Sequence, residues 1–88
     1  MSETHDPAEA IGTVTHYFSH LSVAALSLRA PLAVGDRIHI RGHTTDLVQT
    51  VESMEIEHRR VERANPGDDV AIKVADHVRE HDRVFREP

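Results

Sequence analysis

The fold is decided by the stretch Arg41-Gly42-His43-Thr44-Thr45-Asp46-Leu47-Val48-Gln49-Thr50-Val51-Glu52-Ser53-Met54-Glu55-Ile56-Glu57-His58, a polar loop that runs into a long strand. Leu47, Gln49 and Val51 lie two residues apart, and Met54, Ile56 and His58 do so on the opposite parity. Because alternate residues of a strand point to opposite faces, this phase change would send one set to solvent. One extra residue at Glu52-Ser53, a β-bulge, would keep both sets inward and bend the strand. Bent strands of this kind close small barrels.

Short strands are predicted on both sides of this stretch. β-branched, aromatic and alternating apolar residues favour strands at 11–18 and 21–28, paired as a hairpin, and at 37–41, 69–75 and 83–86. Gly12 suggests a bend, and residues 76–80 are compatible with a single helical turn. Six strands separated by turn signals predict an all-β barrel or sandwich. Its expected core is Ile11, Val14, Phe18, Leu26, Leu28, Val34, Ile38, Ile40, Val51, Met54, Ile56, Val61, Val70, Ile72, Val74 and Val84.

Composition narrows the class of protein. At 88 residues the chain is expected to hold one domain over residues 10–88, preceded by a disordered tail at 1–9. It has no cysteine, which excludes disulfides, thiolate zinc sites and thiol nucleophiles and fits a reducing compartment. The N-terminus lacks the features of a signal peptide, and no apolar run is long enough to cross a bilayer. We therefore expect a cytoplasmic, monomeric protein without a membrane partner.

Charge argues against general binding of nucleic acid. The formal net charge is −5, with one Lys against nine Arg, so bulk electrostatics do not favour a phosphate backbone. DNA is not an expected partner, although a local RNA site stays open.

A family resemblance rests on several short motifs. Gly12-Thr13-Val14 and the turns Val34-Gly35-Asp36 and Ala64-Asn65-Pro66-Gly67-Asp68 resemble the second domain of translational GTPases such as elongation factor Tu. Ile40-Arg41-Gly42-His43-Thr44-Thr45-Asp46, followed by Gln49–His58, is similar to small stand-alone elongation-factor-like proteins and to the barrel appended to collagenase-like peptidases. The resemblance covers about residues 11–87.

The resemblance implies a six-stranded, closed Greek-key β-barrel of the translation-protein type. GTPase activity is not implied, because the chain has four glycines and no phosphate-binding loop with the required spacing. We therefore expect a non-catalytic binding module without a cofactor, in contact with tRNA, ribosome-associated RNA or a translation-associated protein. The alternative is a protein–protein accessory module that acts in trans with a collagenase-like peptidase.

Two groups of residues are candidate binding sites. The first is the loop Arg41, Gly42, His43, Thr44, Thr45 and Asp46, because loops on rigid scaffolds often carry recognition. His43, the threonines and Asp46 contain the residue types of a catalytic triad. A turn in which Thr and Asp side chains bond to local backbone N–H groups, and Gly42 supplies an unusual φ, is the favoured interpretation. The second group is the basic cluster His58, Arg59 and Arg60, for which interleaved glutamates predict a self-paired, solvated surface.

Eight histidines raise the question of a metal site. Three pairs have HxxxH spacing, at His16/His20, His39/His43 and His77/His81. On a strand this spacing separates two side chains by roughly 13 Å, too far for one ion. Only the third pair falls on a potential helical turn, and we predict no metal site.

Overall fold

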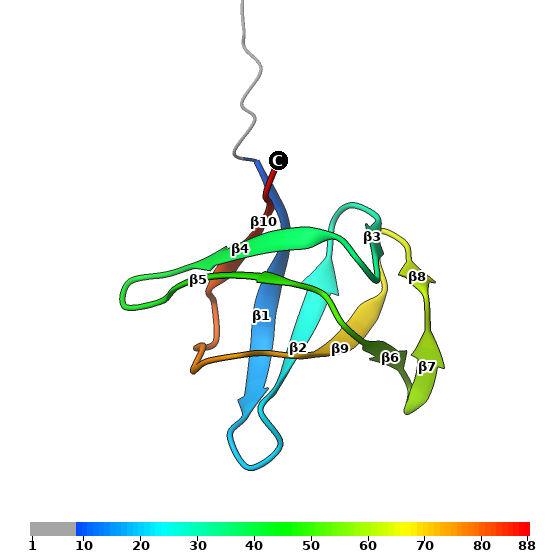
Figure 1. The fold of residues 1–88 in the computed structure, drawn as a ribbon, viewed down its shortest axis with the longest axis horizontal. Coiled ribbons are helices and arrows are strands. Elements are labelled where there is room, and N and C mark those ends of the chain that lie inside the picture. The colour runs from blue at the N-terminus through cyan, green and yellow to red at the C-terminus, as the bar shows by residue number, and fades with distance from the viewer. Residues whose placement is uncertain (1–8) are drawn as a thin grey trace, which may run out of the picture.

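The computed structural model describes residues 9–88, which fold into ten β-strands (Figure 1). The predicted tail at 1–9 lies outside the described residues except for Glu9. The strands are β1 (Ala10–Phe18), β2 (Val23–Leu28), β3 (Leu32–Ala33), β4 (Arg37–Arg41), β5 (Asp46–Thr50), β6 (Met54–Ile56), β7 (Arg59–Val61), β8 (Arg63–Ala64), β9 (Asp69–Lys73) and β10 (Arg83–Arg86). None of the described residues belongs to a helix that could cross a membrane.

Eight of the strands form one curled antiparallel sheet in the order β5-β4-β10-β1-β2-β9-β6-β7. The two remaining strands, β3 and β8, pair with each other beside it. β5 and β7 are the two edges of the large sheet, so the sheet is open (Figure 1). The all-β prediction is confirmed, whereas the closed six-stranded barrel is wrong.

The physical reason for the open sheet lies at residues 51–53. β5 pairs with β4, whereas β6 pairs with β9. Between β5 and β6 the chain passes through three residues that belong to no strand, and there it changes from one partner strand to the other. The predicted one-residue bulge is thus a break at which the chain changes partners. The break still keeps the apolar residues on both sides of it inward, because Val51 and Met54 are both fully buried.

The core lies inside the curl of the sheet and matches most of the predicted set. Its buried side chains include Leu26, Ile38, Ile40, Ile72 and Val84, with Val34, Ile56 and Val61 packed against it. The sequence did not indicate Leu32, Ala64 or Val78 as core residues. Phe18 was expected inside but is 42% exposed. The ladder between β1 and β2 shifts register between Val14 and His16. This irregularity reverses the parity of the later residues, so that Tyr17 packs against the core and Phe18 points outward.

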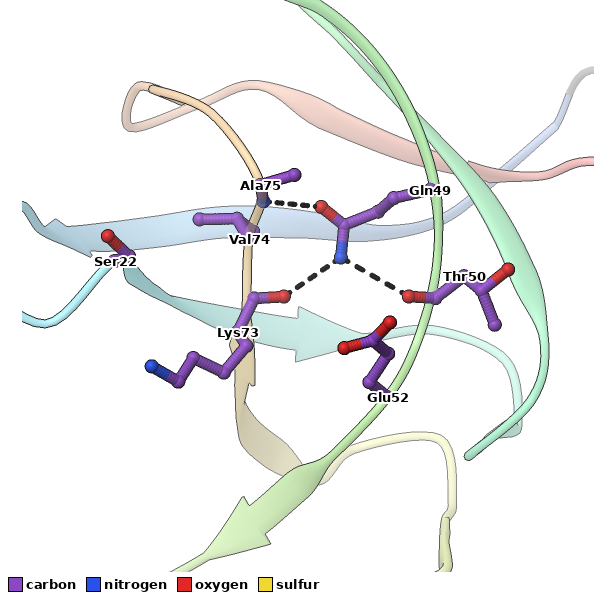
Figure 2. Close-up of a pocket in the computed structure, with 7 residues that line it drawn as sticks. All are labelled: Ser22, Gln49, Thr50, Glu52, Lys73, Val74 and Ala75. Carbon is purple, nitrogen blue, oxygen red and sulfur yellow. Dashed lines mark hydrogen bonds between the residues drawn. The ribbon is translucent and has the colours of Figure 1, made fainter.

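The Gln49 side chain joins β5 to the end of β9 and the first residues after it, where no backbone ladder does (Figure 2). Its amide nitrogen donates to the carbonyl oxygen of Lys73 at 2.8 Å, and its amide oxygen accepts from the N–H of Ala75 at 2.8 Å. The amide group therefore pairs with this backbone much as a neighbouring strand would. This explains why a polar residue occupies an inward position of the predicted strand.

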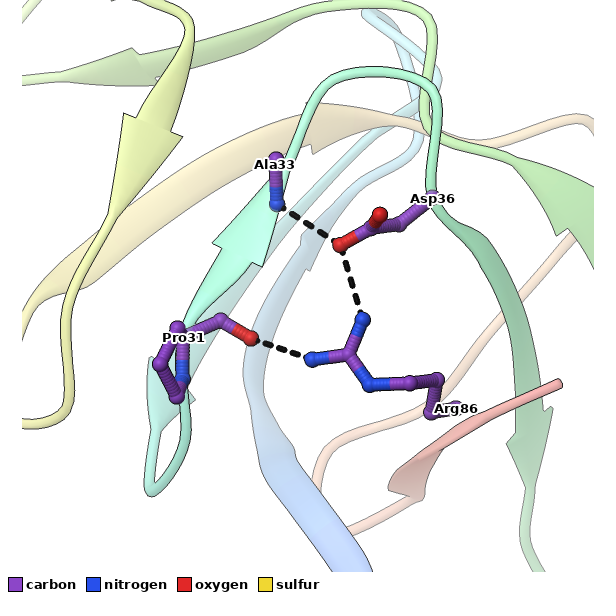
Figure 3. A network of polar contacts seen from close by, with 4 residues as sticks. All are labelled: Pro31, Ala33, Asp36 and Arg86. Atoms are coloured by element: carbon purple, nitrogen blue, oxygen red, sulfur yellow. Dashed lines mark hydrogen bonds and ion pairs between the residues drawn. The ribbon is translucent and has the colours of Figure 1, made fainter. Parts of the chain in front are cut away.

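A second polar connection secures the C-terminal strand (Figure 3). Arg86 of β10 donates from Nη1 to Asp36 Oδ2 at 2.9 Å and from Nη2 to the carbonyl oxygen of Pro31 at 2.6 Å. Asp36 Oδ2 also accepts from the N–H of Ala33 at 2.9 Å. One guanidinium group thus holds the turn before β4 against β10.

The turns follow the sequence in part. Gly35 and Gly67, in the two Gly-Asp turns, have positive φ, at 98° and 91°. The crossover at 74–82 contains no helical turn. Val78 is fully buried instead, and it holds the extended crossover against the core.

Candidate functional site

The loop predicted as a binding site joins β4 to β5 and projects from one side of the sheet (Figure 1). The N–H of Gly42 donates to the carbonyl oxygen of Thr45 at 2.9 Å, which closes the base of the loop. His43 and Thr44 are exposed at its tip, as are Arg41 and Asp46 at the strand ends. Thr45 is buried, at 7% exposure, so its side chain is withdrawn from any ligand on this surface.

Gly42 is required by packing and not by its φ. It is absent from the residues with positive φ, so that part of the prediction is wrong. A Cβ atom at this position would stand 1.8 Å from Oδ1 of Asp82, a carboxylate that is itself 4% exposed. Asp82 Oδ2 accepts from the N–H of Arg79 at 2.8 Å and so orders the end of the crossover. The loop therefore rests directly on that turn.

The Asp46 carboxylate is held by a histidine of the neighbouring strand. Nε2 of His39 donates to Asp46 Oδ1 at 2.5 Å, and His39 Nδ1 lies 4.0 Å from Oε1 of Glu87. The triad-like arrangement within residues 43–46 is thus not formed, and no Thr or Asp side chain of this loop bonds to a loop N–H among residues 9–88. Sequence reasoning missed His39, although the outward alternation of Arg37, His39 and Arg41 could have indicated it.

These groups belong to a larger charged surface. We call it the β4 face, and it consists of outward side chains of β4, β5 and β10 together with Glu87: Arg37, His39, Arg41, Asp46, Val48, Thr50, Arg83, Phe85 and Glu87. The Arg41 guanidinium lies over the Phe85 ring, 5.7 Å from its centroid, in a cation–π contact. Three arginines and two carboxylates gather here on a chain of net charge −5. The β4 face can bind a ligand of mixed charge.

The second predicted cluster is not part of this surface. His58, Arg59 and Arg60 are exposed on β7 and the turn before it, whereas Asp46 belongs to the opposite edge strand (Figure 1). Glu55 and Arg60 are cross-strand partners, yet neither takes part in an ion pair within residues 9–88. The predicted self-pairing of this cluster is therefore wrong.

The histidines do not assemble into a metal site within the part of the chain that the structure describes. His16 lies 3.3 Å from Glu80, and the His77 ring meets Tyr17 edge-on at 4.7 Å. A hollow of about 420 Å³ lies beside Gln49, Glu52 and Lys73 (Figure 2). The Gln49 amide on its wall is already bonded to the backbone and serves the fold.

Comparison with curated proteins relates the chain to collagenase-like enzymes. It is 43% identical over 76 residues to an uncharacterized protease of Methanocaldococcus jannaschii, across 85% of this chain and 19% of that protein. It is 37% identical over 78 residues to a collagenase of Porphyromonas gingivalis, across 86% of this chain and 22% of the collagenase. The chain thus spans about a fifth of the length of these relatives. No family model matches it.

Solved structures show the same fold in a peptidase domain. The C-terminal domain of a putative U32 peptidase of Geobacillus thermoleovorans superposes with a TM-score of 0.87 and 20% identity, across 98% of this chain and 100% of that one. Its selenomethionine variant gives a TM-score of 0.83 and 22% identity, across 90% and 99%. The chain is therefore homologous to a part of collagenase-like proteins, as one half of the resemblance implied. The translation-factor half gains no support from these proteins.

Proposed function

We propose that this chain is a non-catalytic accessory module that binds a collagenase-like peptidase and acts in trans. The observation that carries the proposal is the extent of the match. Nearly the whole folded part of the chain aligns with a fifth of each curated relative, and a peptidase C-terminal domain of the same extent has the same fold. A unit that recurs in cis beside an enzyme is well suited to dock on such an enzyme as a separate chain.

The geometry of the β4 face supports a binding role over a catalytic one. His39 is oriented by Asp46 and lies near Glu87, but within residues 9–88 no hydroxyl group hydrogen-bonds to it. A His–Asp pair needs a nucleophile or an activated water in contact with the imidazole to carry out hydrolysis. The surrounding arginines and the Phe85 ring are instead typical of protein interfaces.

The test uses the Porphyromonas gingivalis collagenase with its matched 78-residue segment deleted. We expect the purified chain to bind the truncated enzyme with a Kd of about 1 µM by calorimetry, and to bind the intact enzyme far more weakly, because the endogenous segment competes. Added chain should also restore part of the lost gelatin hydrolysis. Absence of binding to the truncated enzyme would refute the proposal.

A matched variant and an RNA titration complete the design. Arg41→Glu reverses one charge of the β4 face at an exposed position and should weaken binding without unfolding the chain. Titration with tRNA at low and moderate salt addresses the translation-related prediction. Saturable tRNA binding that persists at moderate salt, with no binding to the truncated enzyme, would favour that prediction instead.

A further inference from the structure

A groove lies on the outer surface of the sheet, over the strands β1, β2, β9 and β6 that follow β10 of the β4 face in the strand order. It has a volume of about 230 Å³ and is lined by Phe18, Ala25, Glu55, Glu57, His58, Asp69, Val70 and Ala71. We call it the Phe18 groove. Ala25 of β2, Ala71 of β9 and Glu55 of β6 are successive partners across three strands. Two adjacent alanines leave a depression because the larger side chains around them stand higher.

The wall of the groove is an aromatic ring that the fold leaves in water. Phe18 is 42% exposed, and its ring lies in a tilted contact with the His16 ring, with the two ring centroids 4.4 Å apart. Exposed aromatic side chains next to a small apolar depression are typical anchors of protein interfaces. Together with Ala25 and Ala71, Phe18 offers an apolar seat for one aliphatic side chain.

The rim of the groove is acidic. Glu55, Glu57 and Asp69 border it, and no lysine or arginine lines it. None of these three carboxylates takes part in an ion pair among the residues that the structure describes. Three carboxylates around an apolar floor, with no lysine or arginine in the lining, favour cationic groups over phosphate groups, so a nucleic acid or an anionic lipid surface fits poorly here.

Part of the rim is a strained two-residue turn. The turn between β6 and β7 consists of Glu57 and His58, with φ of 51° and 67°. A two-residue hairpin turn with both φ values positive normally contains Asn and Gly, because other L-residues are strained there. A Glu and a His in these two positions reduce stability, and they place a carboxylate and an imidazole at the groove.

We propose that the Phe18 groove binds an extended segment of the partner peptidase in which one aliphatic side chain is flanked by Lys or Arg. The aliphatic side chain packs against Phe18, Ala25 and Ala71, and the flanking cations pair with Glu55, Glu57 and Asp69. The identity of the partner rests on the proposed function, whereas the chemistry of the ligand follows from the groove itself.

The first experiment titrates the isotope-labelled chain with a capped peptide, Gly-Arg-Leu-Arg-Gly, and follows amide chemical shifts. We expect saturable shifts centred on Ala25, Val70 and Ala71, with a Kd of roughly 1 mM or below, as suits a single anchor residue. The peptides Gly-Glu-Leu-Glu-Gly and Gly-Arg-Gly-Arg-Gly should each bind about tenfold more weakly. Equal shifts with all three peptides, or no shifts at these amides, would overturn the proposal.

Variants then separate the two contributions. Phe18→Ala should weaken binding about tenfold, while Leu21→Ala, a change of an exposed apolar residue outside the groove, should leave it unchanged. Glu55→Gln with Glu57→Gln should weaken binding at low salt, and the difference should shrink as salt screens the charges. Ala71→Ile fills the floor of the groove and should also weaken binding. An outward strand position favours β-branched residues, so this variant tests the groove even where Phe18→Ala destabilises the chain.

The truncated collagenase distinguishes this proposal from the proposed function. If the unaltered chain binds the truncated enzyme and both Phe18→Ala and Ala71→Ile bind equally well, the groove proposal fails and the proposed function stands. If the Arg-Leu-Arg peptide binds at the groove and the truncated enzyme does not bind, the proposed function fails and the ligand chemistry of the groove stands.

Discussion

Gly42 lies so close to Asp82 that a Cβ atom on residue 42 would stand 1.8 Å from the carboxylate oxygen Oδ1. The first residue of the exposed loop is thus fitted against the one carboxylate that is buried among residues 9–88. The position of the loop therefore depends on the end of the crossover that precedes β10.

Replacing Gly42 by Ala should destabilise the protein by about 1–3 kcal/mol, because the methyl group overlaps the Asp82 carboxylate and one of them has to move. Urea unfolding followed by circular dichroism measures this change. In an Asp82→Ala background no side-chain atom beyond Cβ remains to overlap, so the same substitution should cost much less. An equal cost in both backgrounds would show that the close approach is not the cause.

Gln49→Met should cost about 2 kcal/mol of unfolding free energy. The isosteric side chain keeps the volume, but it leaves the Lys73 carbonyl and the Ala75 N–H without the partners that they have at 2.8 Å. Hydrogen exchange at the Ala75 amide should become faster by a larger factor than exchange in β1. Thr50→Ala, an exposed change at the next position, is the control and should shift stability by less than about 0.5 kcal/mol. Unchanged exchange at Ala75 would contradict this account.

Arg86→Lys should destabilise almost as much as Arg86→Ala, by about 1 kcal/mol. The guanidinium group reaches Asp36 and the Pro31 carbonyl with two different nitrogens, and one ammonium group cannot reproduce that fork. Thermal unfolding of both variants at two salt concentrations measures the two losses of stability. Full stability of the lysine variant would mean that charge alone matters at this position.

The double variant Glu57→Asn with His58→Gly should stabilise the protein by about 1–2 kcal/mol. Both residues have positive φ in a two-residue turn, and Asn-Gly adopts that backbone without the strain of the native pair. The same variant should weaken binding of the Arg-Leu-Arg peptide, because it removes a carboxylate from the rim of the Phe18 groove. A variant that is less stable than the native chain would disprove the strain argument.

Alternation of side chains predicted most of the strands correctly. The hairpin of β1 and β2, and the strands β4, β9 and β10, lie at or within two residues of the predicted ranges. Alternation does not specify a partner, however, so the break at 51–53 looked like a bulge within one strand. Phe18 was misplaced for a related reason, because the register shift after Val14 reverses the parity of the residues that follow. Pairs as short as β3 and β8 leave almost no periodic signal.

The candidate site was predicted less well than the fold. The loop at 41–46 is exposed as expected, apart from Thr45, but its interactions come from residues distant in sequence. His39 reaches Asp46 through the hairpin register, and Asp82 reaches Gly42 through the pairing of β10 with β4. The Phe18 groove has no sequence motif, since its floor and rim come from separate strands.

The pairing of Ala10 with Phe85 places the start of β1 beside the end of β10 (Figure 1). A polypeptide joined at either of these points would leave the module from the same place. Phe18 lies at the opposite end of the nine-residue β1, roughly 26 Å away. A linker at this end would thus act as a hinge. The turn between β1 and β2 and the Phe18 groove beside it lie farthest from that hinge, so they would move through the largest volume.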